Sequence, residues 1–181
     1  MTADRLRAAV AERVAAVRAE IATAARAAAR DPASIRIVAV TKTLPPEAAL
    51  AALAAGLGDL GENYVQEGRL KRLAVEGRCA WHLIGGLQRN KVRAAVAVFD
   101  RLHTLDSDEA SRPHFRLLRE VRDRTASGLG VELPHLSMGM SDDFTVAVEE
   151  GATWLRLGRA LFGARGPGAW RPGSSAGGQG S

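Results

Sequence analysis

Three kinds of residue are scarce in this chain of 181 residues: cysteine, the aromatic residues and lysine. The single cysteine, Cys79, excludes an intrachain disulfide and a cysteine metal cluster. Aromatic residues make up only 4%, and no basic run with interleaved aromatics occurs, so the net charge of +5 does not predict nucleic-acid binding. That charge suits anionic small molecules equally well. No run of about 18 apolar residues is present to span a membrane.

The sequence also predicts neither a metal site nor a transit peptide. The four histidines, at positions 82, 103, 114 and 135, lack the paired spacing of a metal site. The Ala- and Arg-rich amino terminus has the composition of a transit peptide, but acidic residues interrupt it. We therefore expect one cytoplasmic domain over residues 1–165, followed by a disordered tail over residues 166–181 that is rich in Gly, Ser and Pro.

Hydrophobic periodicity predicts helices and strands in alternation along the chain. We expect helices over residues 3–29, 45–55, 65–76, 90–97, 111–125 and 141–150, and strands over 35–41, 57–62, 81–84, 98–105, 134–138 and 154–157. The first strand is apolar almost throughout, as in a parallel strand that is buried on both faces. The alternation predicts a parallel α/β architecture, in which functional side chains gather at the carboxyl ends of the strands.

Lys42 stands out because it follows the first predicted strand in a chain with few lysines. Of 25 lysines and arginines, only Lys42, Lys71 and Lys91 are lysines. A lysine amine can lose its proton and attack a carbonyl carbon to form a Schiff base, whereas a guanidinium cannot. Apolar surroundings favour the neutral amine. The alternative is a lysine whose stem lies along the end of the strand while its amine reaches water.

Two turns of small residues follow later strands and can bind a phosphate. The turn at residues 137–141 and the turn at Gly158 both lead toward helices, whose first backbone N–H groups attract anions. Gly and Ser are also ordinary turn and cap residues, so either turn alone is weak evidence. Asp142 and Asp143 oppose an anion there unless they point outward as capping acids.

Five motifs, in order, resemble the pyridoxal phosphate homeostasis protein family. They are IVAVTK at 37–42, GENYVQE at 61–67, WHLIG at 81–85 with LQRNK at 87–91, LSMGMS at 136–141, and LRLG at 155–158 followed by LFGAR at 161–165. The resemblance implies a TIM-barrel-like domain of the alanine racemase amino-terminal type. Family members bind pyridoxal 5′-phosphate (PLP) and supply or buffer it, without an established catalytic reaction.

The resemblance also implies roles for five residues of this chain. Lys42 holds PLP as a Schiff base, Asn63 faces the cofactor ring, and Arg156 meets the pyridine nitrogen. Ser137 and the Gly158 turn hold the phosphate. Catalytic residues and a metal are not implied. PLP-dependent apo-enzymes are the implied partners, and the chain is expected to be a monomer or a weak homodimer.

The chain departs from the family pattern in its middle and at one turn. After Ser107 it passes within about five residues to a segment that resembles the helix before the family's seventh strand, so two strand-helix units are missing. A full barrel needs about 200 to 250 residues, and we expect an abbreviated barrel of about six β/α units. The remaining strands then close into a narrower barrel, stay open with exposed edges, or have those edges covered by a partner chain. Arg159 stands where the family often has threonine.

Three functions remain open at this point. The first is a PLP-binding homeostasis protein, which Arg156 favours because an arginine cannot give a proton to the ring nitrogen, and an unprotonated ring is a poorer electron sink. The second is a racemase-like enzyme, which needs a second acid or base opposite Lys42; Tyr64 is the only tyrosine. The third is a deleted relative that no longer binds PLP.

Overall fold

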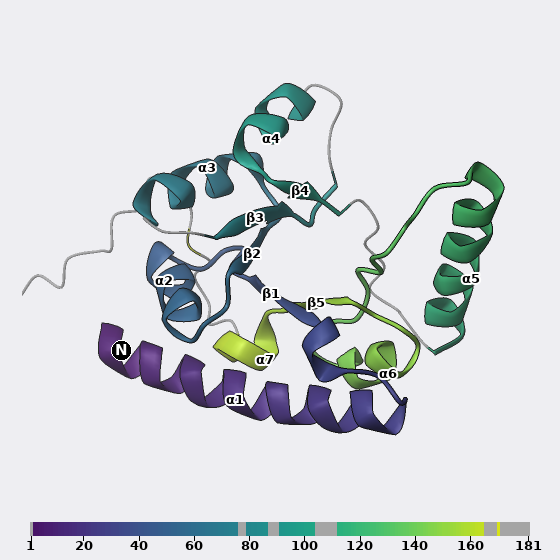
Figure 1. Ribbon diagram of the computed structural model, residues 1–181. Helices are drawn as coiled ribbons and strands as arrows, with labels where there is room; N and C mark the ends of the chain where they lie inside the picture. Colours follow the sequence, from purple (N-terminus) through teal and green to yellow (C-terminus); the bar gives the residue numbers. More distant parts are fainter. Residues whose placement is uncertain (1, 76–78, 87–90, 104–111, 165–169, 171–181) are drawn as a thin grey trace, which may run out of the picture.

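Five parallel strands form one curled sheet at the centre of the protein (Figure 1). The computed structural model describes residues 2–75, 79–86, 91–103, 112–164 and 170. The strands are β1 (Arg36–Val40), β2 (Asp59–Glu62), β3 (Ala80–Leu83), β4 (Arg101–Leu102) and β5 (Trp154–Leu157). Their order in the sheet is β4-β3-β2-β1-β5, so β1 lies between β2 and β5. This order brings the carboxyl ends of β2, β1 and β5 side by side.

Helices cover the outside of the sheet. They are α1 (Ala3–Ala27), α2 (Pro46–Ala54), α3 (Val65–Ala74), α4 (Val92–Val98), α5 (Arg112–Leu129), α6 (Phe144–Glu149) and α7 (Arg159–Phe162), with a 3-10 turn at Pro32–Ser34. The long helix α1 lies across α2, α6 and α7 (Figure 1). None of the helices in the described ranges is long and apolar enough to cross a membrane.

Helix α1 forms because its apolar residues recur at three- and four-residue steps. Val10, Val14, Val17 and Ile21 form a stripe that is buried in the core, and Leu6 extends it as a partly buried residue. At about 1.5–3 kcal/mol for each fully buried aliphatic side chain, this one face supplies a substantial part of the driving force for docking the helix. Thr2 caps the helix by accepting the backbone N–H of Arg5 at 3.4 Å.

Most of the predicted elements are confirmed, but two predicted strands are wrong in extent. The segment 98–105 was expected to be a strand, yet Val98 still belongs to α4 and the described strand β4 has only two residues. A short apolar run cannot be assigned to helix or strand by periodicity alone, which explains the error. Residues 104 and 105 lie outside the described part, as do the residues around the predicted join after Ser107.

The segment 134–138 also fails to form a regular strand. It makes one isolated parallel bridge, between Ser137 and Trp154. Pro134 has no backbone N–H to give to a ladder. Both the N–H and the hydroxyl of Thr153 donate to the carbonyl oxygen of Leu136.

Two helix boundaries also differ from expectation by more than two residues. Helix α5 continues to Leu129 and stops before Gly130, whose φ of +63° is left-handed. Helix α6 begins at Phe144 rather than at residue 141. Helix α7 was not predicted. The predicted disordered tail lies outside the described residues, apart from Trp170, whose backbone N–H donates to the carbonyl of Thr43 at 2.9 Å.

The two edges of the sheet meet through side chains. His103 follows β4 at one edge, and Ser137 lies beyond β5 at the other. The Nδ1 atom of His103 is 2.6 Å from the Ser137 hydroxyl, and its Nε2 is 2.8 Å from Nδ1 of His82. Within the described ranges, no strand pairing joins β4 to Ser137. We call this junction the seam.

Candidate functional site

A cavity of about 410 Å³ opens at the carboxyl ends of β1, β2 and β5. Four of the five predicted site residues line it: Lys42, Asn63, Arg156 and Gly158. Lys42 follows β1, Asn63 follows β2, Arg156 lies in β5 and Gly158 follows it. Because these three parallel strands are neighbours, residues far apart in sequence converge on one point, as is usual in α/β proteins.

Asn63 presents an unsatisfied polar atom near this cavity. Its Oδ1 is buried and has no hydrogen-bond partner among the described residues. A buried acceptor without a donor costs about 1–3 kcal/mol, and this oxygen is free to accept a hydrogen bond from a bound molecule. Gly85 sits directly against this residue: a Cβ added there would lie 2.7 Å from the Asn63 carbonyl oxygen. Only a glycine therefore lets the end of β3 approach Asn63 so closely.

Ser137, the fifth predicted residue, does not line this cavity. Its hydroxyl bonds to His103, and its hydroxyl and carbonyl oxygens both accept from Nη1 of Arg156, at 3.1 and 2.7 Å. Ser137 therefore supports Arg156 from the seam side. Ser141 of the same motif does line the cavity, and its hydroxyl accepts the backbone N–H of Ala160 at 3.1 Å. Choosing between the two serines requires the three-dimensional path of the turn.

The two aspartates of this turn are directed to other partners. Asp142 pairs with the Arg159 guanidinium, and both side chains are largely exposed. Asp143 accepts the backbone N–H of Met140 through Oδ1 at 2.6 Å. One acid is therefore paired with an arginine, and the other is engaged by a backbone N–H within the turn rather than capping α6 through its side chain. Arg159 lines the cavity together with Asp142.

A buried polar network beneath Lys42 was missed by the sequence reasoning. Lys71 of α3 is fully buried, and its Nζ lies 2.7 Å from Oε1 of Glu62 and 2.6 Å from the carbonyl oxygen of Thr41. Glu67, one helical turn before Lys71, is also buried. Burial raises the pKa of Glu62 to about 7 against the opposing charge of Lys71. The available signal was the i, i+4 spacing of Glu67 and Lys71.

A second polar cluster fills the sheet interior near the seam. His82 is fully buried between Asp59 and His103, with its Nε2 2.9 Å from Oδ1 of Asp59. Burial opposes ionisation of Asp59, but the hydrogen bond from His82 and the charge of Arg36 lower its pKa below the ordinary value. Burial also lowers the pKa of His103 to about 4. Each ring nitrogen of His82 and of His103 lies within hydrogen-bond distance of another side chain.

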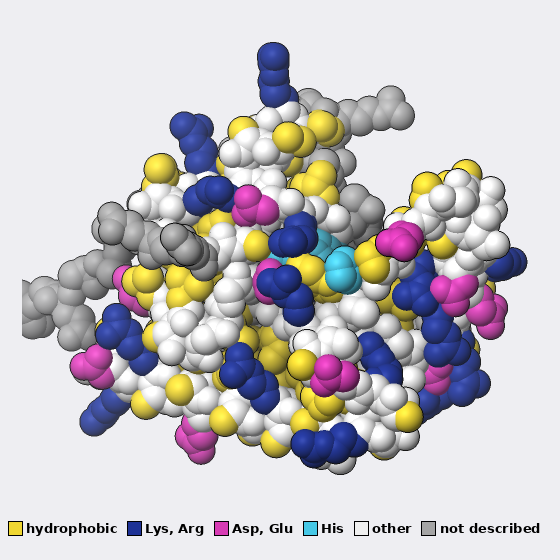
Figure 2. Space-filling model, viewed as in Figure 1, with side chains coloured by type: hydrophobic (Ala, Val, Ile, Leu, Met, Phe, Trp, Pro, Cys, Tyr) yellow, Lys and Arg dark blue, Asp and Glu magenta, His cyan; other side chains and the backbone are white. Residues whose placement is uncertain are grey.

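A cavity of about 530 Å³ lies at the seam, between β4, β5 and α5. Arg156 lines both this cavity and the one at Lys42. Figure 2 shows cyan histidine side chains with dark blue basic side chains beside them in the hollow between the sheet and α5. The seam therefore brings basic groups close to the predicted site without adding an acid to the cavity lining.

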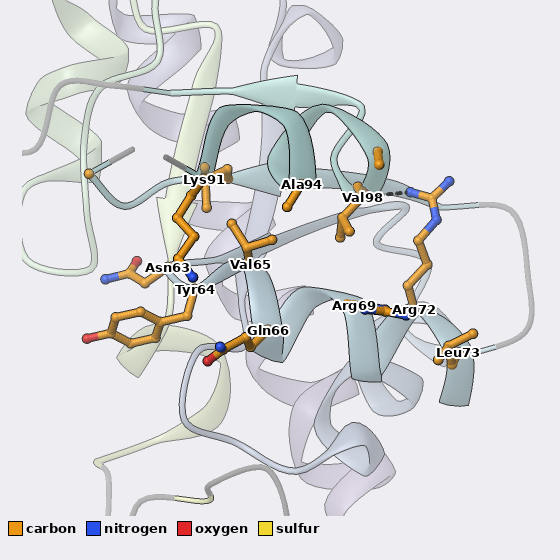
Figure 3. Close-up of a pocket in the computed structure, with 13 residues that line it drawn as sticks. Asn63, Tyr64, Val65, Gln66, Arg69, Arg72, Leu73, Lys91, Ala94 and Val98 are labelled. Atoms are coloured by element: carbon orange, nitrogen blue, oxygen red, sulfur yellow. Dashed lines mark hydrogen bonds between the residues drawn. The ribbon is translucent and has the colours of Figure 1, made fainter. Parts of the chain in front are cut away.

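A third cavity, of about 860 Å³ and larger than the two described above, lies between α3 and α4 (Figure 3). Tyr64, Arg69 and Lys91 are among its lining residues. The Tyr64 side chain is 58% exposed and is directed away from the space between the two helices in Figure 3. Tyr64 is absent from the lining of the Lys42 cavity. The structure therefore does not bring Tyr64 together with Lys42 in one cavity.

Comparison with known proteins assigns the chain to a family. No family model matches. The pyridoxal phosphate homeostasis protein of Pseudomonas aeruginosa is 36% identical, covering 88% of this chain and 97% of the relative, and that of Escherichia coli K12 is 33% identical, covering 86% and 97%. The first alignment extends over 225 positions, more than this chain contains, so the relative carries residues that face gaps here.

Solved structures agree with this assignment. PipY of Synechococcus elongatus without PLP matches with a TM-score of 0.72 and 28% identity, covering 85% of this chain and all of PipY. PipY with PLP bound matches with a TM-score of 0.62 and 29% identity over the same shares. On sequence identity, coverage and fold together, the chain belongs to the pyridoxal phosphate homeostasis protein family.

Proposed function

We propose that this chain binds PLP covalently through Lys42 and takes part in PLP homeostasis. The observation that carries the proposal is the convergence of Lys42, Asn63 and Arg156 on one cavity from three neighbouring strands. These residues fit the cofactor because Lys42 offers an amine and the buried Oδ1 of Asn63 lacks a donor. Two arginines, Arg156 and Arg159, also line the cavity. PipY, a structural relative, has been described with PLP bound.

Each residue has a distinct role in this proposal. PLP supplies an aldehyde, which condenses with an amine as water leaves. Lys42 provides that amine, and Asn63 lies against the ring with its free acceptor. Arg156, held by Ser137, faces the ring nitrogen and leaves it unprotonated, because a guanidinium keeps its proton. The ring then remains a weak electron sink, which favours storage of the cofactor over its use in catalysis.

The phosphate is bound at the two small-residue turns. Ser137 was the serine expected to bind it, but the cavity lining favours Ser141, whose hydroxyl faces the turn after Gly158. We assign the phosphate to Ser141, to the Gly158 turn and to Arg159. The guanidinium of Arg159 can bind a phosphate while it also pairs with Asp142. Ser137 acts indirectly, by holding Arg156.

A carrier fits the site better than a racemase-like enzyme does. Racemisation by two bases needs an acid or base across from Lys42. Tyr64, the candidate from the sequence, lines the cavity between α3 and α4 instead. Recipients of the cofactor would be PLP-dependent apo-enzymes, and we propose a monomer or weak homodimer. The curled sheet is then an abbreviated alanine-racemase-type barrel of about six β/α units, in residues 1–165, closed at the seam.

The test is the visible absorption spectrum of the purified chain after PLP is added and the excess removed. Wild type should show a stoichiometric band of lysine-linked PLP, Lys42→Ala should lack it, and Lys91→Ala should keep it, since Lys91 is exposed and lines another cavity. A wild type without the band would overturn the proposal and leave the deleted, non-binding relative. Turnover of an amino acid that Tyr64→Phe abolishes would favour the racemase-like enzyme.

A further inference from the structure

The peptide units on both sides of Lys42 are held by side chains from α3. The Nζ of Lys71 donates to the carbonyl oxygen of Thr41, at 2.6 Å, and Oε2 of Glu67 accepts the backbone N–H of Thr43, at 3.0 Å. Thr41 and Thr43 are the chain neighbours of Lys42. One helix thus fixes the backbone immediately before and after the lysine.

Thr43 needs such support because of its backbone conformation. Its φ is +61°, in the left-handed region that a β-branched residue rarely adopts. A residue stays in this region only where its surroundings hold it there. The bond from its N–H to Glu67 and the bond from Trp170 to its carbonyl do so. Without them, the chain after Lys42 is free to relax and to turn the lysine away from the cavity.

Glu62 holds Lys71 in turn. It accepts from Nζ of Lys71 at 2.7 Å and from the Thr41 hydroxyl at 2.5 Å. Glu67 lies 3.8 Å from the same Nζ, and the Trp170 ring lies 5.2 Å from it. Two buried carboxyl groups therefore share one buried amine, which explains why a flexible lysine can keep a single position under the strand.

We propose that Glu67 and Lys71 are positioning residues that fix the backbone on both sides of Lys42 and so direct its amine into the cavity, with Glu62 anchoring Lys71. For its effect on PLP, this inference rests on the function proposed above. Its structural part does not, because the hold on Thr41 and Thr43 exists without a ligand. The competing explanation is a network that serves stability alone.

The first measurement is amide hydrogen exchange at Thr43 in the chain without PLP, read by NMR. Glu67→Leu removes the acceptor, and exchange at Thr43 should accelerate by about tenfold, the order expected for loss of one hydrogen bond. Glu67→Gln keeps an acceptor oxygen and should restore most of the protection. Glu47→Leu, at an exposed acid in the first turn of α2, is the matched control and should leave Thr43 unchanged.

The second measurement separates positioning from stability. Made in a Glu67→Gln background, which keeps the acceptor for Thr43, the double variant Glu62→Gln, Lys71→Met leaves no unpaired charge in this buried network, and such replacements are often neutral for stability. It should melt within a few degrees of wild type, yet bind PLP about tenfold more weakly because Thr41 has lost its donor. Unchanged PLP affinity in this double variant, at unchanged melting temperature, would overturn the inference.

The outcomes distinguish the two proposals. A wild type that never binds PLP contradicts the proposed function, while the exchange measurement still decides whether α3 holds the Lys42 loop. A wild type that binds PLP, together with a folded Glu67→Leu variant whose Thr43 exchange and PLP affinity match wild type, contradicts the positioning role alone.

Discussion

Neighbouring strands are joined in different ways around Lys42 and at the seam. Around Lys42, strands β2, β1 and β5 are joined by continuous parallel ladders, and α3 closes the layer with buried side chains. At the seam, His103 and Ser137 are joined by one side-chain hydrogen bond. The predicted site therefore rests on strands that are paired with one another through their backbones.

Helix α5 beside the seam shows the same contrast. Its buried apolar anchor in the described part is Phe115, and arginines 112, 116 and 119 tie it to Glu150 after α6. Leu117, Val121 and Leu129 remain exposed. Partly exposed ion pairs contribute little to stability, so α5 is held less firmly than α3. The site at β2, β1 and β5 thus keeps its backbone pairing although no strand pairing joins β4 to Ser137 in the described ranges.

The largest expected effect is on the Lys42 side, from Lys71→Met alone. This change leaves Glu62 buried without its counter-charge and should lower the free energy of unfolding by about 3 kcal/mol at pH 8, measured by urea denaturation. The loss should shrink toward pH 5. Burial already raises the pKa of Glu62 from 4.5 to about 7. Between these two pH values the folded state binds a proton at Glu62 that the unfolded state has released. The free energy of unfolding therefore falls as pH rises through this range.

The control for this prediction is Lys91→Met, at an exposed lysine, which should change the free energy of unfolding by less than about 0.5 kcal/mol. An equal loss at pH 5 and pH 8 in Lys71→Met would contradict the assigned role of the Glu62 charge.

The next effect concerns the close approach of β3 to Asn63. Gly85→Ala places a Cβ 2.7 Å from the Asn63 carbonyl oxygen, and we expect a loss of about 1–3 kcal/mol in the free energy of unfolding together with weaker PLP binding. Gly86→Ala is the matched control, because a Cβ there meets nothing within 4 Å. Equal behaviour of the two variants would show that Asn63 is not held at this contact.

The seam should be the acid-sensitive part of the protein. Burial lowers the pKa of His103 from 6.5 to about 4, so the unfolded state takes up a proton there before the folded state does. The contribution of His103 to the free energy of unfolding is complete above about pH 6.5 and is lost as pH falls toward 4. The loss amounts to about 1–2 kcal/mol after allowance for solvent screening.

Unfolding measured at pH 7 and pH 5 tests this prediction. His103→Gln should cost less stability, relative to wild type measured at the same pH, at pH 5 than at pH 7. A pH dependence that His103→Gln leaves intact would place the acid sensitivity outside the seam.

The smallest effect separates the two serines of the 137–141 turn. Ser141→Ala removes a hydroxyl at the cavity and should weaken PLP binding about fivefold, the size of one hydrogen bond. Ser137→Ala acts only through Arg156 and His103 and should weaken PLP binding less while lowering stability more. Titration with PLP and thermal melting of both variants measure this. The reverse order would return the phosphate to Ser137, as first expected.

The predicted strands and helices succeeded where the chain repeats a clear period. The stripe of α1 and the apolar run of β1 were correctly identified, because burial of one helix face or of both strand faces leaves a pattern in the residue types. The prediction failed at 98–105 and 134–138, where the apolar run is short or contains proline. Pairing in those segments depends on what lies beside them in space.

The candidate site divides in the same way. Lys42, Asn63, Arg156 and Gly158 were named together by the family resemblance, and the expectation that the carboxyl ends of parallel strands share one edge agrees with their place in one cavity. The burial of Lys71 could not be predicted, since an i, i+4 acid and base on a helix is more often a solvated pair. Lys71, and not Lys42, proved to be the fully buried lysine.

The sequence by itself determined the family, the alternation of elements and the strand ends that meet at the site, because local period and motif order are written in the residues. Only the tertiary structure decided which serine reaches the cavity, which lysine lies under the sheet and how the shortened sheet joins its edges. Those outcomes depend on contacts between residues distant in the chain, such as His103 with Ser137 and Lys71 with Thr41, whose geometry no local pattern specifies.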